Sequence, residues 1–164
     1  MDRKDERILE CLREDSSLTT REISKKTRIP ITTVHKRIKK LKQEGIIKRF
    51  TIELDNRKIG KAFSAIILVS CDYKLLKELK KDQHQLAKEL SHIPEVVSVD
   101  VVTGVTDIVV KVRMKDVEEF DTFLLKKFQK ILGVDRTQSL VVMHEAWFYR
   151  KQFIDRYNFF DYDN

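Results

Sequence analysis

The feature of the sequence that most constrains the fold is a break of only four residues between two helical patterns near the N-terminus. Thr19-Thr20-Arg21-Glu22 has the form of a capping box, which opens a short helix that we expect to run to Lys26. Residues 27–30 interrupt it, because the residue before Pro30 disfavours the helical conformation. A second helical pattern begins at Ile31. Two helices joined by so tight a turn predict a helix-turn-helix.

The helix that begins at Ile31 is expected to continue to Glu44, where Gly45 ends it. Its apolar positions recur at intervals of four and three, so they share one face, which we expect to pack against a first helix over residues 2–14. Residues 50–55 alternate apolar and polar side chains, which indicates a strand. Three helices followed by a strand predict a winged helix-turn-helix. The inward residues of the third helix are Val34, Ile38 and Leu41.

The excess positive charge of the chain lies entirely in this first part. Residues 1–58 contain 17 Lys/Arg and 10 Asp/Glu, residues 59–164 contain 16 of each, and the whole chain has a formal net charge of +7. No acidic residue occurs between Glu22 and Glu44. Third helices of this kind enter the major groove, where hydroxyl and basic side chains reach phosphates and base edges. We therefore predict contacts with double-stranded DNA from Thr32, Thr33, His35, Lys36, Arg37, Lys39 and Lys40.

The pattern changes after Gly60, where we place the boundary between a DNA-binding domain with its linker strand (1–60) and a second domain (61–149). The second domain has the order β-α-β-β-α-β, a ferredoxin-like unit, so the fold class is α+β. Residues 150–164 are a C-terminal extension. The strands are expected over residues 63–70, 96–102, 108–112 and 138–148, and the helices over residues 75–93 and 117–128.

A series of motifs runs in order along residues 2–148. In the first part they are Asp2-x-x-Asp5-x-x-Ile8-Leu9, Thr33-Val34-His35-x-Arg37-Ile38-x-x-Leu41, Gly45-Ile46-Ile47-Lys48-Arg49-Phe50, and Leu54-Asp55 followed by Ile59-Gly60. In the second part they are Pro94-Glu95-Val96, Thr103-Gly104-Val105-Thr106-Asp107 and Gly133-Val134-x-x-Thr137. These motifs resemble the leucine-responsive regulatory protein/AsnC (Lrp/AsnC) family of transcription regulators. The resemblance implies a DNA-binding head and a ferredoxin-like body of the RAM type that forms homodimers, often assembled into octamers.

The resemblance also implies that an amino acid or related small molecule binds between neighbouring dimers. Gly104 lets the backbone turn tightly and leaves amide groups accessible, and Asp107 can pair with an ammonium group or cap its own turn. Val105 is apolar where the family often has a polar or aromatic residue, which favours a hydrophobic amino acid or no ligand at all. We predict an effector site formed by Thr103, Gly104, Val105, Thr106 and Asp107, with hydroxyl groups from Thr137 and Ser139.

Three features depart from the family pattern. Arg28 stands where the family usually has Gly at the end of the second helix, and a side chain in a left-handed cap costs about 1 kcal/mol, so we expect this turn to differ. Pro30 replaces the usual Ser before the third helix, which removes a side-chain cap but suits the start of a helix. Residues 72–84 are longer than the usual connection, and residues 150–164 extend past the usual end.

The body is expected to associate with a second copy. Its two helices cover only one face of a sheet rich in Val and Ile, and an exposed apolar face of that size is an association surface. The strand over residues 50–54 is expected to join this dimer. The aromatic residues of the extension either add a contact or form a solvated end; they are Phe153, Tyr157, Phe159, Phe160 and Tyr162.

Other classes of function have little support in the sequence. The four histidines lack metal-ligand spacing, and no arrangement suggests a catalytic nucleophile or a phosphate-binding loop. Cys11 and Cys71 are interpreted as small hydrophobes in a reducing compartment. No apolar run approaches the roughly 20 residues of a membrane span, and a charged N-terminus without an apolar signal region predicts a cytoplasmic protein. We expect no enzyme activity, no cofactor, no metal and no membrane partner.

Two alternatives remain open. The same basic head would serve an RNA-binding or architectural, nucleoid-type DNA-binding protein without an effector. Sirohaem decarboxylases resemble the family in fold, and they are expected to need His, Tyr or Arg on the central hairpin. That hairpin reads Val99-Asp100-Val101-Val102-Thr103-Gly104, which contains none of these residues.

Overall fold

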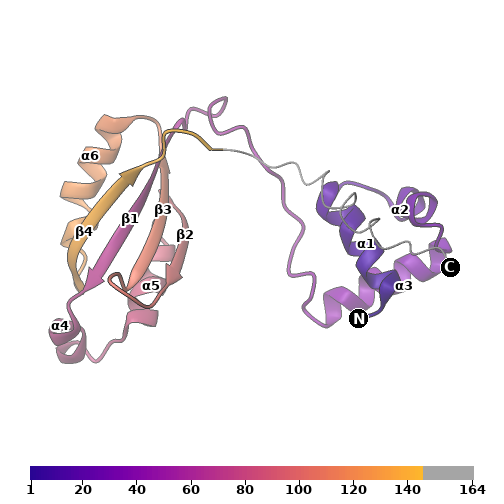
Figure 1. Cartoon of the computed structure of the whole chain (residues 1–164), viewed down its shortest axis with the longest axis horizontal. Helices are drawn as coiled ribbons and strands as arrows, with labels where there is room; N and C mark the ends of the chain where they lie inside the picture. Colours follow the sequence, from indigo (N-terminus) through magenta and orange to yellow (C-terminus); the bar gives the residue numbers. More distant parts are fainter. Residues whose placement is uncertain (146–164) are drawn as a thin grey trace, which may run out of the picture. The chain divides into compact units, whose positions relative to one another are not determined.

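The computed structural model of the chain describes residues 1–145, in two units over residues 1–53 and 54–145 (Figure 1). The predicted α+β class, a helix-turn-helix followed by a ferredoxin-like sheet with helices, is confirmed. The first unit contains α1 (Arg3–Glu14), α2 (Thr20–Thr27) and α3 (Ile31–Gln43). The second contains β1 (Phe63–Cys71), α4 (Tyr73–Glu78), α5 (Gln83–Ser91), β2 (Val96–Val101), β3 (Ile108–Met114), α6 (Val117–Lys126), the 3-10 helix η1 (Phe128–Lys130) and β4 (Val134–Val141).

The three helices of the first unit begin and pack much as their sequence predicts. The hydroxyl of Thr19 accepts a hydrogen bond from the backbone N–H of Glu22, and the Glu22 carboxylate accepts one from the backbone N–H of Thr19, which confirms the capping box of α2. A small apolar core joins the helices and buries the inward face of α3. Its fully buried members are Ile8, Ile23, Ile29 and Val34, with Cys11, Leu12, Leu18 and Ile38 packed around them.

The strand expected over residues 50–55 does not form in the single chain. Phe50, Ile52 and Leu54 are 44%, 76% and 48% exposed. A strand is stable only when a neighbouring strand pairs with its backbone or another element packs against its face. The alternation of side chains provides neither of these contacts. The predicted strand over residues 50–55 is therefore wrong for the isolated chain, and the apolar side chains of this segment are exposed to solvent.

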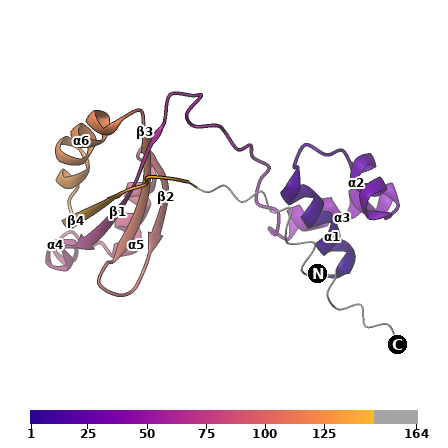
Figure 2. The same ribbon diagram turned by 45° about the horizontal axis from the view of Figure 1, so that its top comes forward.

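The sheet of the second unit is antiparallel with the strand order β2-β3-β1-β4 (Figures 1 and 2). Alternate residues of β1, namely Ala65, Ile67 and Val69, are fully buried. They belong to the same apolar core as residues of α5 and α6, so both helices cover one face of the sheet. Ile66, Leu68 and Ser70 alternate with them and are half-buried on the opposite, open face.

The open face of the sheet is mixed in character. Ile66 pairs in register with Leu140 and Lys111, and Leu68 pairs with Val109. Beside these apolar residues, Arg113 and Lys111 share the carboxylate of Glu145, with nitrogen–oxygen distances of 2.7 Å for both. The expected apolar association surface therefore also contains a charged cluster. The aromatic residues of the extension, at positions 153–162, lie outside the described residues.

The helix expected over residues 75–93 is in fact two helices. Lys80 adopts a left-handed conformation with φ of 54°, and the backbone N–H groups of Lys80 and Lys81 donate to the carbonyls of Lys77 and Leu76. This double closure ends α4 as a Schellman motif does, with lysine where glycine is usual. The apolar residues before and after Lys80 keep helical spacing, so the periodicity of the sequence does not reveal the break between α4 and α5.

The last strand begins and ends earlier than its predicted bounds of 138–148. It starts at Val134, directly after Gly133, and residues 146–148 lie outside the described part. Gly133 has φ of 103°, and a Cβ atom added to it would lie 2.6 Å from Cδ2 of Leu76. Its carbonyl also accepts a hydrogen bond from the backbone N–H of Asp72 at 2.9 Å. The start of β4 is thus fitted closely against α4.

Candidate DNA-binding and effector-binding sites

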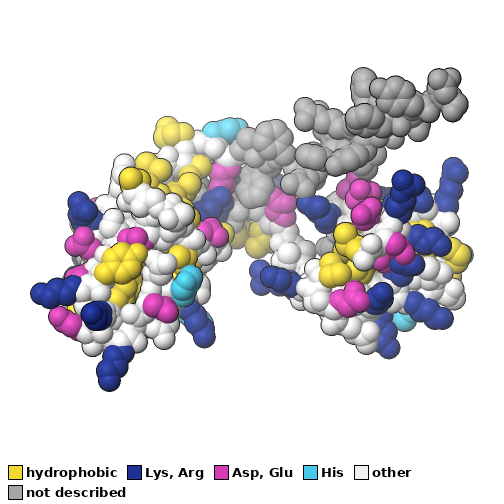
Figure 3. Space-filling view, turned by 60° about the horizontal axis from the view of Figure 1, so that its bottom comes forward, with side chains coloured by type: hydrophobic (Ala, Val, Ile, Leu, Met, Phe, Trp, Pro, Cys, Tyr) yellow, Lys and Arg dark blue, Asp and Glu magenta, His cyan; other side chains and the backbone are white. Residues whose placement is uncertain are grey.

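The exposed face of α3 carries five of the seven side chains predicted to contact DNA. Thr32, His35, Lys36, Lys39 and Lys40 are exposed, whereas Thr33 is half-buried. Lys40 also lies 3.7 Å from the Glu44 carboxylate, an exposed pair of the kind that contributes little to stability. Lys and Arg side chains are numerous on the surface of the first unit (Figure 3). Because α3 contains no acidic residue, this face can approach a polyanion without repulsion.

Arg37 lies on a different side of α3 and has a different environment. Its Nη1 atom is 2.7 Å from a carboxylate oxygen of Asp2 and 2.8 Å from one of Asp5, both at the start of α1. The hydrogen bond from Arg37, followed by that from the backbone N–H of Asp2, holds the pKa of Asp5 below its usual value. Arg37 therefore ties α3 to α1, a role that its inclusion among the DNA contacts did not anticipate.

The turn between α2 and α3 keeps a left-handed residue although no glycine is present. Arg28 has φ of 54° and ψ of 28°, so the side chain adopts the conformation that glycine usually supplies. Pro30 precedes α3 and gives no side-chain cap, while its carbonyl accepts hydrogen bonds from the backbone N–H groups of Thr33 and Val34. The turn thus stays tight at a cost of about 1 kcal/mol.

Two exposed basic residues after α3 extend this surface. Lys48 and Arg49 precede Phe50, and Nζ of Lys42 lies 4.5 Å from the centre of the Phe50 ring. This cation–π contact holds the segment against the end of α3. Sequence reasoning included Lys48 and Arg49 only as parts of a family motif, although two consecutive cations beside a basic helix are themselves a signal for nucleic-acid contact.

The loop predicted to bind the effector joins β2 to β3. Thr103 and Gly104 are exposed, and Val105 at the tip is fully exposed at 102%. Asp107 does not fold back on its own turn. Its Oδ2 atom accepts a hydrogen bond from the backbone N–H of Cys71 at 2.8 Å, and its Oδ1 atom accepts one from the Tyr73 hydroxyl at 2.7 Å. Each carboxylate oxygen therefore accepts one hydrogen bond, one from the end of β1 and one from the start of α4.

Thr137 and Ser139 do not meet this loop within one chain. They pair with Val69 and Ile67 of β1, on the side of β1 away from β3. Since neighbouring strands are about 4.8 Å apart, Thr137 lies two strands, or roughly 10 Å, from the loop end at Asp107. The Thr137 hydroxyl accepts a hydrogen bond from the Gln129 side chain at 2.9 Å. The loop and the two hydroxyl residues are therefore on separate strands of the sheet within one chain.

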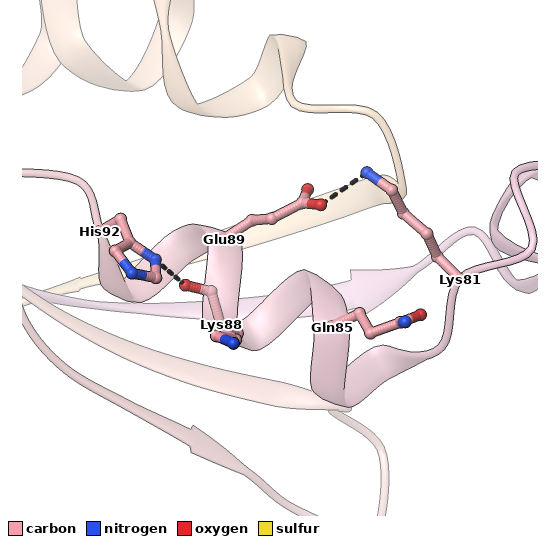
Figure 4. A pocket seen from close by; sticks show the side chains of 5 residues that line it. All are labelled: Lys81, Gln85, Lys88, Glu89 and His92. Atoms are coloured by element: carbon pink, nitrogen blue, oxygen red, sulfur yellow. Dashed lines mark hydrogen bonds and ion pairs between the residues drawn. The ribbon is translucent and has the colours of Figure 1, made fainter.

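A shallow pocket of about 260 Å³ lies elsewhere on the body, against α5. Nζ of Lys81 is 2.6 Å from a carboxylate oxygen of Glu89, and Nδ1 of His92 is 2.6 Å from the carbonyl oxygen of Lys88, so its polar groups largely pair with one another (Figure 4). None of the predicted effector residues contributes to it. The lining residues are Lys81, Gln85, Lys88, Glu89 and His92.

Within residues 1–145, no group of three or more His, Cys, Asp or Glu side chains is placed to hold a metal ion. Burial raises the pKa of the Cys71 thiol to about 11, so this cysteine stays neutral. In the same described part, no helix is long and apolar enough to cross a membrane.

Comparison with known protein families accounts for both units. The family model of the Lrp/AsnC ligand binding domain matches residues 64–151, which is more than half of the chain, and a winged helix-turn-helix DNA-binding model matches residues 1–48. The chain belongs to the Lrp/AsnC family. The Lrp/AsnC resemblance of the sequence motifs is thereby confirmed, and the protein is a DNA-binding transcriptional regulator.

Individual Lrp/AsnC relatives match almost the whole chain. An uncharacterized HTH-type transcriptional regulator of Pyrococcus abyssi is 37% identical over 141 residues, which cover 86% of this chain and 91% of that protein. The HTH-type transcriptional regulator FL11 of Pyrococcus horikoshii is 36% identical over 144 residues, which cover 87% of this chain and 89% of that protein. Helix-turn-helix regulators of this family are thus similar to the chain along both of its units.

Solved Lrp/AsnC structures show the same fold. A transcriptional regulator of Neisseria meningitidis, solved as a complex with L-Met, has a TM-score of 0.79 and 27% identity, and the match covers 90% of this chain and 93% of that one. AsnC of Escherichia coli has a TM-score of 0.76 and 26% identity, with coverage of 90% and 95%.

Proposed function

We propose that this Lrp/AsnC regulator reads a specific duplex sequence through the exposed face of α3 and is modulated by an apolar amino acid bound at the 103–107 loop. Residues 1–60 serve as the DNA-binding domain with its linker, and residues 61–149 as the effector-binding and oligomerisation domain. The protein acts in the cytoplasm and has no catalytic role. The observation that carries the proposal is the exposed, acid-free face of α3 formed by Thr32, His35, Lys36, Lys39 and Lys40.

The amino-acid effector is supported by the chemistry of the loop and by a relative. The regulator of Neisseria meningitidis was solved with L-Met. In the present chain the tip residue Val105 is apolar and fully exposed, which suits an apolar side chain. Each oxygen of the Asp107 carboxylate already accepts one hydrogen bond, so further polar groups for a ligand are the backbone amides and carbonyls around Gly104 and the hydroxyls of Thr103 and Thr106.

Assembly into homodimers, and from dimers into octamers, is part of the same proposal. The half-buried Ile66 and Leu68 on the open face of the sheet, and the exposed Leu140 beside them, are apolar groups that a second copy would cover. The exposed segment around Ile52 would gain a strand partner in such a dimer. A second copy would also supply a route for Thr137 and Ser139 to face the loop of a neighbour.

The decisive experiment selects bound fragments from random duplex DNA and then measures affinity for the selected and a scrambled duplex, with and without each amino acid. The proposal expects a preference for the selected duplex of at least about a thousandfold. It also expects one or a few apolar amino acids to raise the midpoint of thermal unfolding and to change the DNA affinity. Equal affinity for both duplexes, with no response to any amino acid, would instead support the architectural alternative.

A further inference from the structure

The hydroxyl of Tyr73 lies where three elements of the body meet. Tyr73 is the first residue of α4, and its hydroxyl oxygen is 2.7 Å from Oδ1 of Asp107 at the start of β3. It is also 2.9 Å from Oε1 of Gln83, the first residue of α5. The Tyr73 side chain thus joins the two helices of the 72–84 connection to the end of the effector loop.

Asp107 is the point at which that loop is fastened. Its backbone N–H donates to the carbonyl of Val69 at 3.0 Å, and its own carbonyl accepts from the backbone N–H of Val102 at 2.9 Å. The carboxylate adds the bonds from the Cys71 N–H and the Tyr73 hydroxyl. Three of these four partners are backbone groups, and the fourth is the side chain of Tyr73.

The position of Tyr73 is itself fixed by the packing of α4. Leu76 is 1% exposed and lies against Gly133, and the backbone N–H of Asp72 donates to the Gly133 carbonyl. The Asp72 side chain also caps α4 by accepting from the backbone N–H of Leu75 at 2.9 Å. The segment that holds Tyr73 is the connection over residues 72–84, which we expect from the sequence to be longer than usual in this family.

The hydrogen bond from the hydroxyl keeps the proton on Tyr73. The carboxylate of Asp107 accepts this bond and raises the pKa of Tyr73 to about 12. Near neutral pH the hydroxyl therefore remains a donor.

We propose that Tyr73 is a positioning residue for the effector loop: its hydroxyl holds Asp107, and with it residues 103–107, in the conformation that binds the amino acid. The inference rests on the proposed function, because it assigns Tyr73 to the same site. The ring is 55% exposed and contributes little to the buried core, so removal of the hydroxyl alone leaves the body folded.

The test compares Tyr73→Phe with Gln83→Ala in the full-length chain. Tyr73→Phe removes the hydrogen bond from the hydroxyl to Asp107, whereas Gln83→Ala removes only the contact between Gln83 and the hydroxyl. Hydrogen exchange of peptides that cover residues 102–107 is expected to be faster in Tyr73→Phe and unchanged in Gln83→Ala. The Kd for the amino acid found with the wild-type protein is expected to rise roughly three- to tenfold in Tyr73→Phe only. The affinity for DNA without amino acid is expected to stay the same in both variants.

If hydrogen exchange of residues 102–107 is unchanged in Tyr73→Phe, the inference is overturned, regardless of the Kd measured for the amino acid. Faster exchange with an unchanged Kd also overturns it, since the loop would then bind its ligand without being positioned. If no amino acid binds the wild-type protein, the proposed effector function fails. In that event faster exchange in Tyr73→Phe alone still supports the tie between Tyr73 and the loop, and unchanged exchange refutes it.

Discussion

Arg37 and Asp5 form an ion pair in which Nη1 of the arginine lies 2.8 Å from Oδ1 of the aspartate, whose side chain is only 7% exposed. The pair connects the middle of the recognition helix α3 to the first turn of α1. Asp2, which caps α1, lies 2.7 Å from the same nitrogen. The Asp2-x-x-Asp5 part of the family motif therefore contacts Arg37, which lies more than 30 residues later in the sequence.

The first prediction concerns Asp5→Asn. Loss of the ion pair should destabilise the first unit by about 1–2 kcal/mol, a value reduced because Arg37 is partly exposed. Since the folded pKa of Asp5 lies below its ordinary value of 3.8, the pair stabilises the fold above that pH and is lost as the pH falls through the lower folded value. Urea unfolding at a series of pH values measures this. Glu10→Gln, at an exposed carboxylate of α1, is the control and should leave the stability unchanged.

The second prediction separates positioning from DNA contact on α3. A residue that neutralises one phosphate adds about −0.9 to the slope of log K against log salt. Lys36→Ala and Lys39→Ala should each reduce the slope by about this amount and leave stability unchanged. Arg37→Gln should lower stability with no change in slope. The reverse result, a smaller slope for Arg37→Gln alone, would make Arg37 the phosphate contact and contradict the assignment of the exposed lysines.

The third prediction concerns the left-handed turn. Arg28→Gly should stabilise the first unit by about 0.5–1 kcal/mol, because glycine removes the cost of the positive φ and loses only part of that gain to the entropy of the unfolded chain. Arg28→Ala is the matched control, since it removes the charge but keeps the Cβ atom. A gain in both variants would mean that charge, and not backbone conformation, is what costs stability at this turn.

The fourth prediction concerns the charged cluster on the open face of the sheet. The side-chain hydrogen bond from Arg113, together with that from Lys111, lowers the pKa of Glu145 to about 2. The cluster therefore stabilises the body above the ordinary pKa of 4.5, and its contribution is lost as the pH falls from about 4.5 to about 2. Glu145→Gln should lower the midpoint of thermal unfolding at pH 7 and have little effect at pH 2, where the wild-type carboxyl is half protonated. An equal decrease in the unfolding midpoint at both pH values would show that the packing of Glu145, and not its charge, stabilises the cluster.

Much of the fold could be predicted because its signals are local. The capping box at Thr19 and the spacing of Val34, Ile38 and Leu41 are each contained within one helix, and both are confirmed. The orientation of Arg37 was also available, since it lies three residues after Val34 and four before Leu41 and so shares their face. Its charge alone suits either DNA or a carboxylate, and its position beside Val34 and Leu41 favours the carboxylates of α1.

The features that were missed depend on contacts that a local pattern cannot show. Residues 50–55 have the alternation of a strand but no strand beside them in one chain. Lys80 ends α4 in a conformation that the sequence marks with neither glycine nor proline. The partners of Asp107 are 36 and 34 residues away, at Cys71 and Tyr73, so the choice between a ligand and a turn cap could not be made from the loop itself.

Gly133 links the packing of α4 to the start of β4. Because Gly133 has no side chain, Leu76 packs directly against the backbone at the start of β4. Tyr73, on the same short helix, is hydrogen-bonded to Asp107. The hairpin, α4 and the start of β4 are therefore joined by direct contacts at Tyr73, Leu76 and Gly133. A side chain at position 133 would push Leu76 away, and α4 with Tyr73 would have to shift even without a ligand.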